Sequence, residues 1–258
     1  MSGLWALAFK NVFLPTFCKT CDARLLTEEN GYFCPNCWES SRRVQRPSCI
    51  VCGRPHGGVV GFGTLQNFPC ADCRDSPEKK RAYRRIYGAA VYDGAVEEAV
   101  KLFKFDGKVR LARPLAVMMG EFAQREMDLD QYDCLVPVPL HRVRERDRGY
   151  NQSRLLATEL LPLFPNARLD ESLRRVRPTR VQSRLSDPAE RRANVRGAFD
   201  VIDVGNVCGK SILLIDDVIT TSGTVGECAR VLRNAGAVHV DIFAAALAMP
   251  GKDRDPIR

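Results

Sequence analysis

The sequence contains no apolar run of the roughly 18 residues that a transmembrane helix requires, so no membrane span is expected. It also has no low-complexity tract, and no repeat apart from its paired cysteines. With 45% hydrophobic and 27% charged residues, wholesale disorder is excluded. Residues 1–17 are apolar but carry a lysine mid-segment, and no small-residue cleavage site follows. They predict a short amphipathic helix packed on the protein itself, with membrane contact as the alternative, rather than a secretory signal.

The 258 residues suffice for one domain of about 150–200 residues and a small appendage. The expected organisation is the helix over 1–17, a cysteine-rich unit over 18–74, a polar linker over 75–83 and an α/β domain over 84–258. Strand-like segments are predicted over 85–92, 133–139, 198–204, 211–217 and 238–248, and helices over 94–105, 110–125, 151–161 and 224–234. This alternation predicts βαβ units and a mostly parallel sheet flanked by helices.

Cysteine is the strongest signal near the N-terminus. Of 11 cysteines, eight form four CxxC pairs: Cys18/Cys21, Cys34/Cys37, Cys49/Cys52 and Cys70/Cys73. A CxxC turn points two thiolates at one ion about 2.3 Å away, and a second turn completes a tetrahedron. So short a segment cannot bury enough core alone, and metal binding would supply its folding free energy. The spacing therefore predicts two zinc ribbons holding two structural zinc ions.

A disulfide framework is the competing interpretation, but no signal peptide is evident. Sequential pairing, the first four cysteines and then the last four, would give two stacked ribbons. An interleaved cross-brace is the alternative because spacing does not fix connectivity. His56 is not needed as a ligand, and a closed four-cysteine site leaves no open position for catalysis. Cys134, Cys208 and Cys228 are predicted to be small buried apolar residues.

A candidate binding site lies in residues 212–224, ILLIDDVITTSGT. An apolar strand ends in two adjacent acids, Asp216 and Asp217, and a hydroxyl-rich turn then leads into a helix. Ligands of open α/β sheets bind beyond the carboxyl ends of strands, and a helix N-terminus after a small-residue loop suits phosphate. The acids suit ribose hydroxyls or Mg²⁺. Together these features predict a site for a phosphorylated ribose.

This stretch resembles the phosphoribosyl-pyrophosphate (PRPP) motif of type I phosphoribosyltransferases. The resemblance implies that Asp216 and Asp217 face the ribose and Mg²⁺. It implies that the 5-phosphate loop consists of Thr220, Thr221, Ser222, Gly223 and Thr224. A pyrophosphate loop is implied at Val138, Pro139, Leu140, His141 and Arg142, and a charged lid over 177–194. Ser222 stands where the family usually has glycine, and Thr220 replaces the base-contacting acid of purine-salvage enzymes.

The order of motifs narrows the resemblance to the ComF family. A double cysteine ribbon is followed by VPVPLHRVRERDRGYNQS, then RPTRVQSRLSDPAERRANVRGAF, and then the PRPP motif. The resemblance implies a type I phosphoribosyltransferase fold and a cytoplasmic role in handling single-stranded DNA during natural transformation. Its implied partners are PRPP, single-stranded DNA and a competence helicase or other uptake proteins. His141 lies in the implied pyrophosphate loop and could act as a general base, but a hydrogen bond within the loop is the favoured interpretation, so the catalytic residue stays unknown.

Charge is concentrated between residues 141 and 196, which hold 14 Arg, no Lys and 7 acids. This strip could neutralise pyrophosphate, follow a nucleic-acid backbone, or be a solvated surface. Arg174, Arg175 and Arg177 are the nucleic-acid candidates. Tyr150, Phe164 and Phe199 are the aromatic residues in this region, so support for base stacking is thin.

Three functions remain open from the sequence. The first is a DNA-uptake factor with a phosphoribosyltransferase fold, favoured by the ribbons and the arginine strip. The second is a metabolic phosphoribosyltransferase using PRPP and Mg²⁺, favoured by the intact acid pair. The third is a zinc-ribbon adaptor with a vestigial domain.

Overall fold

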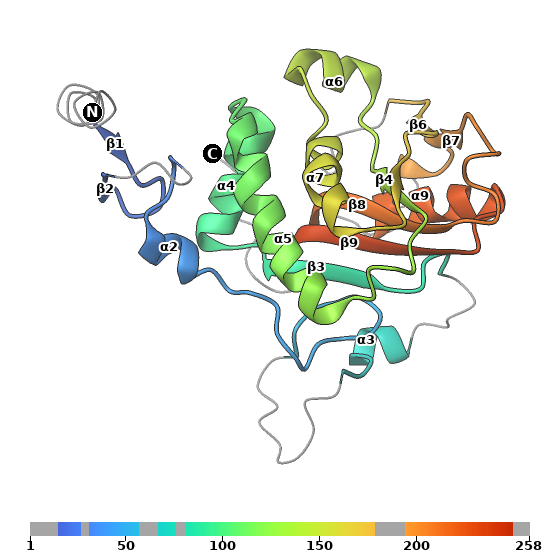
Figure 1. Ribbon diagram of the computed structural model, residues 1–258, viewed down its shortest axis with the longest axis horizontal. Helices are drawn as coiled ribbons and strands as arrows, with labels where there is room; N and C mark the ends of the chain where they lie inside the picture. The colour runs from blue at the N-terminus through green and yellow to red at the C-terminus, as the bar shows by residue number, and fades with distance from the viewer. Residues whose placement is uncertain (1–14, 27–30, 57–66, 76–80, 179–193, 250–258) are drawn as a thin grey trace.

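The computed structural model describes residues 15–26, 31–56, 67–75, 81–178 and 194–249 (Figure 1). The amphipathic helix predicted over 1–17 and most of the lid predicted over 177–194 lie outside these residues. The main sheet contains β3 (Ile86–Val91), β9 (His239–Leu247), β8 (Ser211–Ile219), β4 (Cys134–Pro137) and β5 (Arg168–Leu169), in that spatial order. Every neighbouring pair is parallel, as the alternation of strands and helices predicted.

Helices cover both faces of this sheet. The first face carries α4 (Gly94–Phe105), η2 (Val109–Leu111), α5 (Ala112–Glu126), α7 (Gln152–Leu160) and η3 (Leu161–Leu163). The second face carries α9 (Gly223–Asn234) and the hairpin of β6 (Leu173–Arg175) and β7 (Phe199–Val201). Along β8, Leu213 and Ile215 pack into the first core while Ile212 and Leu214 pack into the second. The continuous apolar run thus forms a strand buried on both sides.

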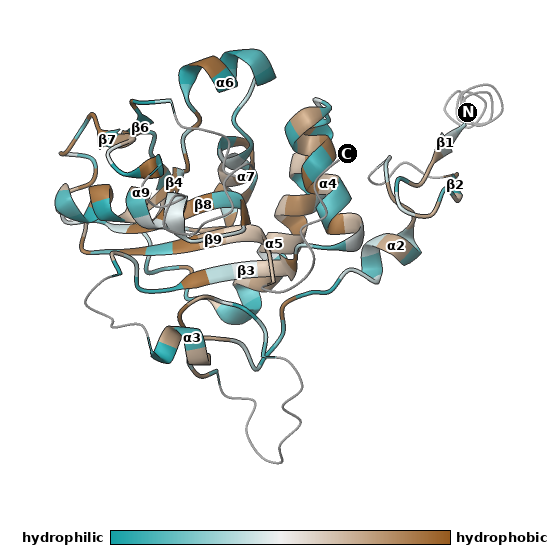
Figure 2. Ribbon diagram, turned by 180° about the vertical axis from the view of Figure 1, so that it is seen from behind, coloured by the Kyte–Doolittle hydropathy of each residue, from teal (hydrophilic) through white to brown (hydrophobic). Residues whose placement is uncertain are grey.

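The cysteine-rich region forms two separate units. The first contains β1 (Thr16–Phe17), β2 (Arg24–Leu25) and α2 (Pro35–Glu39), and its Cys18 and Phe33 join the core beneath α4 and α5. The second contains α3 (Ala71–Arg74) and lies against β3, where the Ile86 N–H donates to the Val51 carbonyl at 2.8 Å. Figures 1 and 2 show α2 and α3 far apart. The ribbons therefore dock on different elements and do not stack on each other.

The segment between the ribbons extends the main sheet. The Val44 N–H donates to the Ala89 carbonyl at 3.0 Å, and the Val91 N–H donates to the Arg42 carbonyl at 2.8 Å. Arg43 and Ala90 form an antiparallel bridge. Because β3 ends the order of strands, this segment supplies hydrogen bonds to an edge that would otherwise offer unpaired groups.

Most predicted helices and strands are confirmed within a few residues. β8 runs to Ile219, so both acids lie within the strand rather than after it. The sequence did not indicate α6 (Arg142–Arg148), a short helix that ends at Gly149 with φ +83°. Asn151 caps α7 as predicted, because its side chain accepts from the Ser153 N–H. Among the described residues, no helix is both long and apolar enough to cross a membrane.

Candidate functional site

Eight cysteines gather in two groups of four. Cys18, Cys21, Cys34 and Cys37 form one group, and Cys49, Cys52, Cys70 and Cys73 form the other. Within each group the sulfur atoms all lie within 4.8 Å of one another. This confirms sequential pairing over the interleaved alternative. His56 is in neither group; its ring stacks on Phe68 at 3.9 Å.

The geometry of both groups suits zinc. Four sulfurs at about 2.3 Å from a central ion lie about 3.8 Å apart at the corners of a tetrahedron. The Sγ atoms of Cys21 and Cys34 are 3.7 Å apart, and those of Cys52 and Cys70 are 3.8 Å apart. The N–H groups of Val51, Cys52 and Cys70 point at Cys49 Sγ from 3.3–3.4 Å, an arrangement that stabilises a thiolate.

The titration of the second group shows why it needs a cation. The hydrogen bond from Cys52 lowers the pKa of Cys49 to about 3, with the backbone N–H groups helping and burial opposing. Burial raises the pKa of Cys73 to about 11, and hydrogen bonding with Cys49 raises the pKa of Cys52 well above its ordinary range. Cys49 therefore ionises readily, and its negative charge disfavours ionisation of Cys52 and Cys73. A divalent ion removes that repulsion, so both groups fit structural zinc.

The acid pair of β8 lies near the carboxyl end of the sheet. Asp217 Oδ1 is 2.9 Å from Lys104 Nζ of α4, and Asp217 is buried. Asp216 Oδ1 accepts from the Ser153 hydroxyl of α7 at 3.1 Å and from the Asp217 N–H at 2.9 Å. Burial and the Asp217 charge raise the pKa of Asp216 to about 7, although Lys104 and the two hydrogen bonds oppose the shift. The pair is therefore only partly neutralised by its protein neighbours.

The loop after β8 leads into α9 as the sequence predicted. Ser222 is the N-cap, with φ −73°, so no positive φ is required where the family usually has glycine. Its main-chain carbonyl accepts from the Gly226 N–H at 2.7 Å, and its side chain bonds to the Tyr83 hydroxyl. The hydroxyl oxygen of Thr221 is buried and has no hydrogen-bond partner among the described residues. A buried hydroxyl of this kind at a helix N-terminus lacks the partner that an anion would provide.

The loop predicted to bind pyrophosphate connects β4 to α6. Its Val138 N–H donates to the Ile215 carbonyl at 2.9 Å, which places the loop beside the acid pair. His141 caps α6 by accepting the Val143 N–H at Nδ1, 3.4 Å away, in agreement with the alternative of a loop hydrogen bond. Pro139, Leu140 and Arg142 follow the same turn, and Arg142 is exposed. The structure thus brings this loop to β8 but gives His141 a capping contact.

The RGYNQS segment acts as a brace for these loops. The Asn151 amide donates to the Val138 carbonyl at 3.0 Å. The Gln152 amide donates to the Phe103 carbonyl at 3.2 Å, and the Tyr150 hydroxyl donates to the same carbonyl. The predicted pyrophosphate loop and the end of α4 are therefore held to one short segment, which keeps Lys104 near β8.

Sequence reasoning missed Lys104 and Ser153, whereas Arg148 lies in the RGYNQ stretch that continues the predicted pyrophosphate loop. Arg148 donates to the Gln152 side chain at 2.6 Å and lies over the Phe105 ring, whose centroid is 5.6 Å away. The available signal for Lys104 was a lysine between two phenylalanines in the last turn of an amphipathic helix. A lysine flanked by two phenylalanines indicates that its ammonium group has an acidic partner. Only the fold identifies Asp217 as that partner.

The arginine strip is not uniform. Arg174 is exposed, and Arg177 is exposed but donates to the carbonyls of Asn194 and Arg196 at 3.1 and 2.9 Å. The Arg175 guanidinium lies over the Phe199 ring, 5.3 Å from its centroid, and burial lowers its pKa. Phe164 and Phe199 are buried, and Tyr150 stacks on Phe103. None of these three aromatics presents an open face for stacking on a base.

Comparisons with known proteins agree with this organisation. The family model described as "Double zinc ribbon domain" matches residues 9–74. Competence protein F of Haemophilus influenzae is 27% identical over 235 residues, which cover 90% of this chain and 96% of that protein. The DNA utilization protein YhgH of Salmonella typhi is 31% identical over 234 residues, covering 89% and 96%.

Among solved structures, glutamine PRPP amidotransferase from B. subtilis, in complex with ADP and GMP, aligns with a TM-score of 0.37 and 20% identity. The alignment covers 54% of this chain and 27% of that protein. The similarity to the competence and DNA utilization proteins instead spans about 90% of the chain. With the double zinc ribbon placed ahead of a parallel sheet flanked by helices, this similarity shows that the chain belongs to the ComF family.

Proposed function

We propose that this protein binds PRPP with Mg²⁺ at the carboxyl end of β8 and handles single-stranded DNA in natural transformation. The PRPP part of the proposal rests on one observation. The acid pair Asp216 and Asp217 is only partly neutralised, and the loop that follows it leads into the N-terminus of α9 and contains the buried Thr221 hydroxyl, which has no hydrogen-bond partner among the described residues. These are the groups that a phosphorylated ribose requires: acceptors for its diol and donors for its phosphate.

Each part of the site has an assigned role in this proposal. The loop of Thr220–Thr224 holds the 5-phosphate with its N–H groups and the Thr221 hydroxyl. Asp216 and Asp217 accept from the ribose hydroxyls and supply carboxylate oxygens, the ligands that Mg²⁺ prefers. Mg²⁺, when bound, neutralises the pyrophosphate. Lys104 neutralises Asp217 before any ligand arrives.

The role in DNA handling is supported by the family and by charge. Relatives along almost the whole chain are named as competence and DNA utilization proteins. The strip from residue 141 to 196 carries a net charge of +7, from 14 Arg against 7 acids. Clusters of thiolates that hold zinc persist in a reducing compartment, so we place the protein in the cytoplasm. A competence helicase or another uptake protein is the proposed protein partner.

Calorimetry with PRPP and Mg²⁺ tests the ligand. The wild-type protein should bind, and Asp216→Asn with Asp217→Asn should abolish binding while zinc content and far-UV circular dichroism stay unchanged. The matched control is Asp130→Asn with Glu159→Gln, which removes two exposed acids elsewhere. Absence of heat from the wild-type protein at millimolar PRPP would show that the site does not bind PRPP.

A metabolic phosphoribosyltransferase is the second candidate, favoured by the intact acid pair beside the pyrophosphate loop. Release of pyrophosphate from PRPP on addition of a nucleobase would support it. Binding of single-stranded DNA without any release of pyrophosphate favours the DNA-handling role. If the protein binds neither PRPP nor DNA, the remaining hypothesis is a zinc-ribbon adaptor with a vestigial domain.

A further inference from the structure

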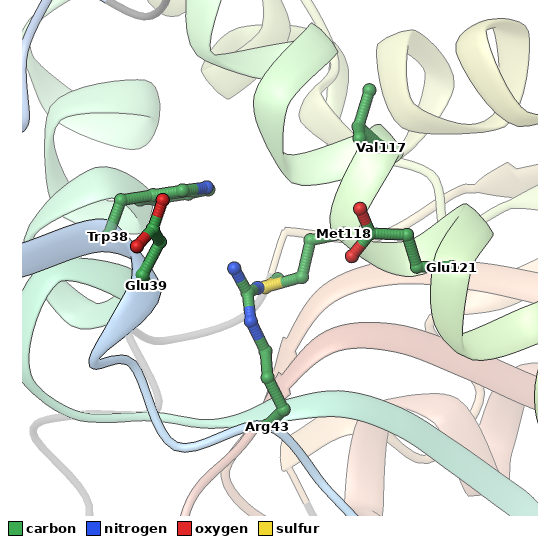
Figure 3. A pocket seen from close by; sticks show the side chains of 6 residues that line it. All are labelled: Trp38, Glu39, Arg43, Val117, Met118 and Glu121. Carbon is green, nitrogen blue, oxygen red and sulfur yellow. The ribbon is translucent and has the colours of Figure 1, made fainter. Parts of the chain in front are cut away.

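The two zinc ribbons differ in what lies beside them. The first ribbon faces α5 across a cavity of about 340 Å³, whose lining includes Trp38, Arg43 and Glu121 (Figure 3). This lining comes from α2, α5 and the segment between the ribbons, and not from the β8 site. The second ribbon instead connects to residues on both sides of the predicted 5-phosphate loop, Thr220–Thr224.

The first connection reaches the loop where it enters α9. The Tyr83 hydroxyl forms a hydrogen bond with the side chain of Ser222, the N-cap of α9. The Tyr83 ring lies against the start of that helix, since a Cβ atom added to Gly226 would be 3.8 Å from Tyr83 Cε1. Arg81, two residues before Tyr83, donates from Nη2 to the Cys73 carbonyl at 2.8 Å. One short segment therefore contacts both the main chain of a predicted zinc ligand and the predicted 5-phosphate loop.

The second connection reaches the loop where it leaves β8. Arg54, two residues after Cys52, donates from Nε to the Ala248 carbonyl at 3.2 Å. The Ala248 N–H donates in turn to the carbonyl of Ile219, the last residue of β8, at 2.9 Å. The loop is thus supported at its strand end and at its helix end by residues tied to one ribbon. Donors that are already held in place bind an anion more tightly, because less conformational freedom is lost on binding.

We propose that the second zinc ribbon positions the 5-phosphate loop, with Tyr83 and Arg54 as positioning residues, so that zinc in this ribbon raises the affinity of the site for a phosphorylated ribose. The proposal rests on the PRPP-binding part of the proposed function. Zinc, when bound, fixes Cys52 and Cys73 relative to each other, and with them the main chain next to Arg54 and Arg81. Coupling between two sites is reciprocal, so a phosphorylated ribose also raises the affinity for zinc.

This arrangement gives serine at position 222 a role. A glycine would allow the same turn but would lack the hydroxyl that bonds to Tyr83. Because the Ser222 hydroxyl is engaged by Tyr83, the phosphate is left to the loop N–H groups and to the buried Thr221 hydroxyl, which has no hydrogen-bond partner among the described residues. The Ser222 side chain therefore connects the loop to the ribbon.

Ribose 5-phosphate is the probe for the loop, and inorganic pyrophosphate with Mg²⁺ is the probe for the other end of the site. In the zinc-loaded full chain, Tyr83→Phe should weaken ribose 5-phosphate about three- to tenfold, the range of one hydrogen bond, and leave pyrophosphate binding unchanged. A general loss of folded protein would weaken both. Tyr32→Phe, which removes a tyrosine hydroxyl of the first ribbon, is the matched control and should change neither.

A double-mutant cycle tests the hydrogen bond itself. Ser222→Ala should give the same loss as Tyr83→Phe, and the double variant should lose no more than either single variant. Additive losses would show that the two hydroxyls act separately, which contradicts the proposal. Arg54→Ala should also weaken ribose 5-phosphate, by about threefold or more. Arg74→Ala, which removes an exposed arginine of the same ribbon, is its control and should not.

Zinc affinity tests the coupling from the other direction. In competition with a chelator at equilibrium, saturating ribose 5-phosphate should raise the zinc affinity of the second ribbon about threefold or more and leave that of the first unchanged. Cys21→Ser, which removes a ligand of the first ribbon, assigns the two affinities. Tyr83→Phe should reduce the response. If Cys21→Ser fails to fold, the comparison of Tyr83→Phe with Tyr32→Phe still decides.

The outcomes separate this inference from the proposed function. If the wild-type protein binds neither ribose 5-phosphate nor PRPP, the PRPP-binding proposal fails and this inference fails with it. If the wild-type protein binds both, but Tyr83→Phe binds ribose 5-phosphate equally well and zinc affinity does not respond, the PRPP site stands and the positioning role is wrong. A response of the first ribbon in place of the second would also overturn it.

Discussion

At the scale of single residues, the acid pair of β8 is unfavourable in the empty protein and would become favourable with the proposed ligand bound. Asp216 and Asp217 are neighbours on one strand, and one nearby lysine, Lys104, contacts Asp217 at 2.9 Å. The charge of Arg175, from β6, also interacts with Asp216, and burial and the Asp216 charge raise the pKa of Cys228 of α9, which stays a neutral thiol. The residues that suit a cationic ligand thus destabilise the empty site.

This conflict predicts a pH dependence of stability without Mg²⁺. The pKa of Asp216 is raised from 3.8 to about 7. A carboxyl with a raised folded-state pKa gives stability that is present below pH 4 and is lost as pH rises towards 7. Asp216→Asn should therefore stabilise the protein at pH 8, by up to about 4 kcal/mol, but not at pH 4. Urea unfolding of both proteins across this range measures the difference.

Zinc release at low pH cancels in that comparison, because both proteins carry the same cysteines. Asp130→Asn, at an exposed position, controls for the loss of one negative charge. A difference between wild-type protein and Asp216→Asn that does not change with pH would contradict the assigned titration.

At the scale of elements, the second ribbon meets β3 at a glycine. Gly53 has φ +71°, and a Cβ atom there would lie 2.4 Å from the Ile86 carbonyl oxygen and 3.3 Å from Leu247. Both the conformation and the close approach therefore require glycine.

Gly53→Ala should lower the free energy of unfolding by about 2–4 kcal/mol, from left-handed strain plus displacement of β3. Gly31→Ala is the matched control, because Gly31 has φ +70° but nothing within 4 Å of the added Cβ. Gly31→Ala should lower the free energy of unfolding only by the left-handed backbone strain, about 1–2 kcal/mol. Chemical unfolding measures both, and equal losses would show that the contact with Ile86 is unimportant.

The elements also show what the sequence could predict. The limits of α4 were predicted correctly, because its apolar spacing begins after a glycine and ends at a polar turn. α6 was missed, since RVRERDR has no apolar face for periodicity to detect. The small hairpin of β6 and β7 was predicted in part: its second strand was expected, but its first is short and pairs across a gap of more than 20 residues.

At the scale of the whole molecule, the zinc ribbons are joined to the main sheet by hydrogen bonds to the edge strand β3. Ile86 donates to Val51 of the second ribbon, and Val91 donates to Arg42 between the ribbons. Removing zinc with a chelator should therefore increase hydrogen exchange at these two amides of β3 by tenfold or more, because their acceptors lose their support. Leu214, on the central strand β8, should remain protected. Unchanged exchange in β3 would mean that the ribbons fold independently of the sheet.

The arginine strip leads to a prediction about salt. Binding of single-stranded DNA should weaken with a log–log slope of about −0.7 for each contacted phosphate. Arg174→Ala with Arg177→Ala should flatten this slope, because both side chains are exposed. Arg175→Ala should instead lower thermal stability, since its guanidinium packs over Phe199. Anisotropy at several salt concentrations, with differential scanning calorimetry, separates these effects. A slope that is unchanged in the double variant would remove this strip from the DNA site.

The features whose chemistry is local could be predicted from the order of residues alone. Four CxxC turns predict zinc because each turn already aims two sulfurs at one point, and an apolar strand with acids and a hydroxyl turn predicts the end of a parallel sheet. Only the tertiary structure decided which ribbon docks where, that the segment around Arg43 completes the edge of β3, and that Lys104 faces Asp217. It also decided that Trp38 and Glu121 line one cavity. These contacts join residues far apart along the chain, and they depend on side chains that meet only after the sheet has formed.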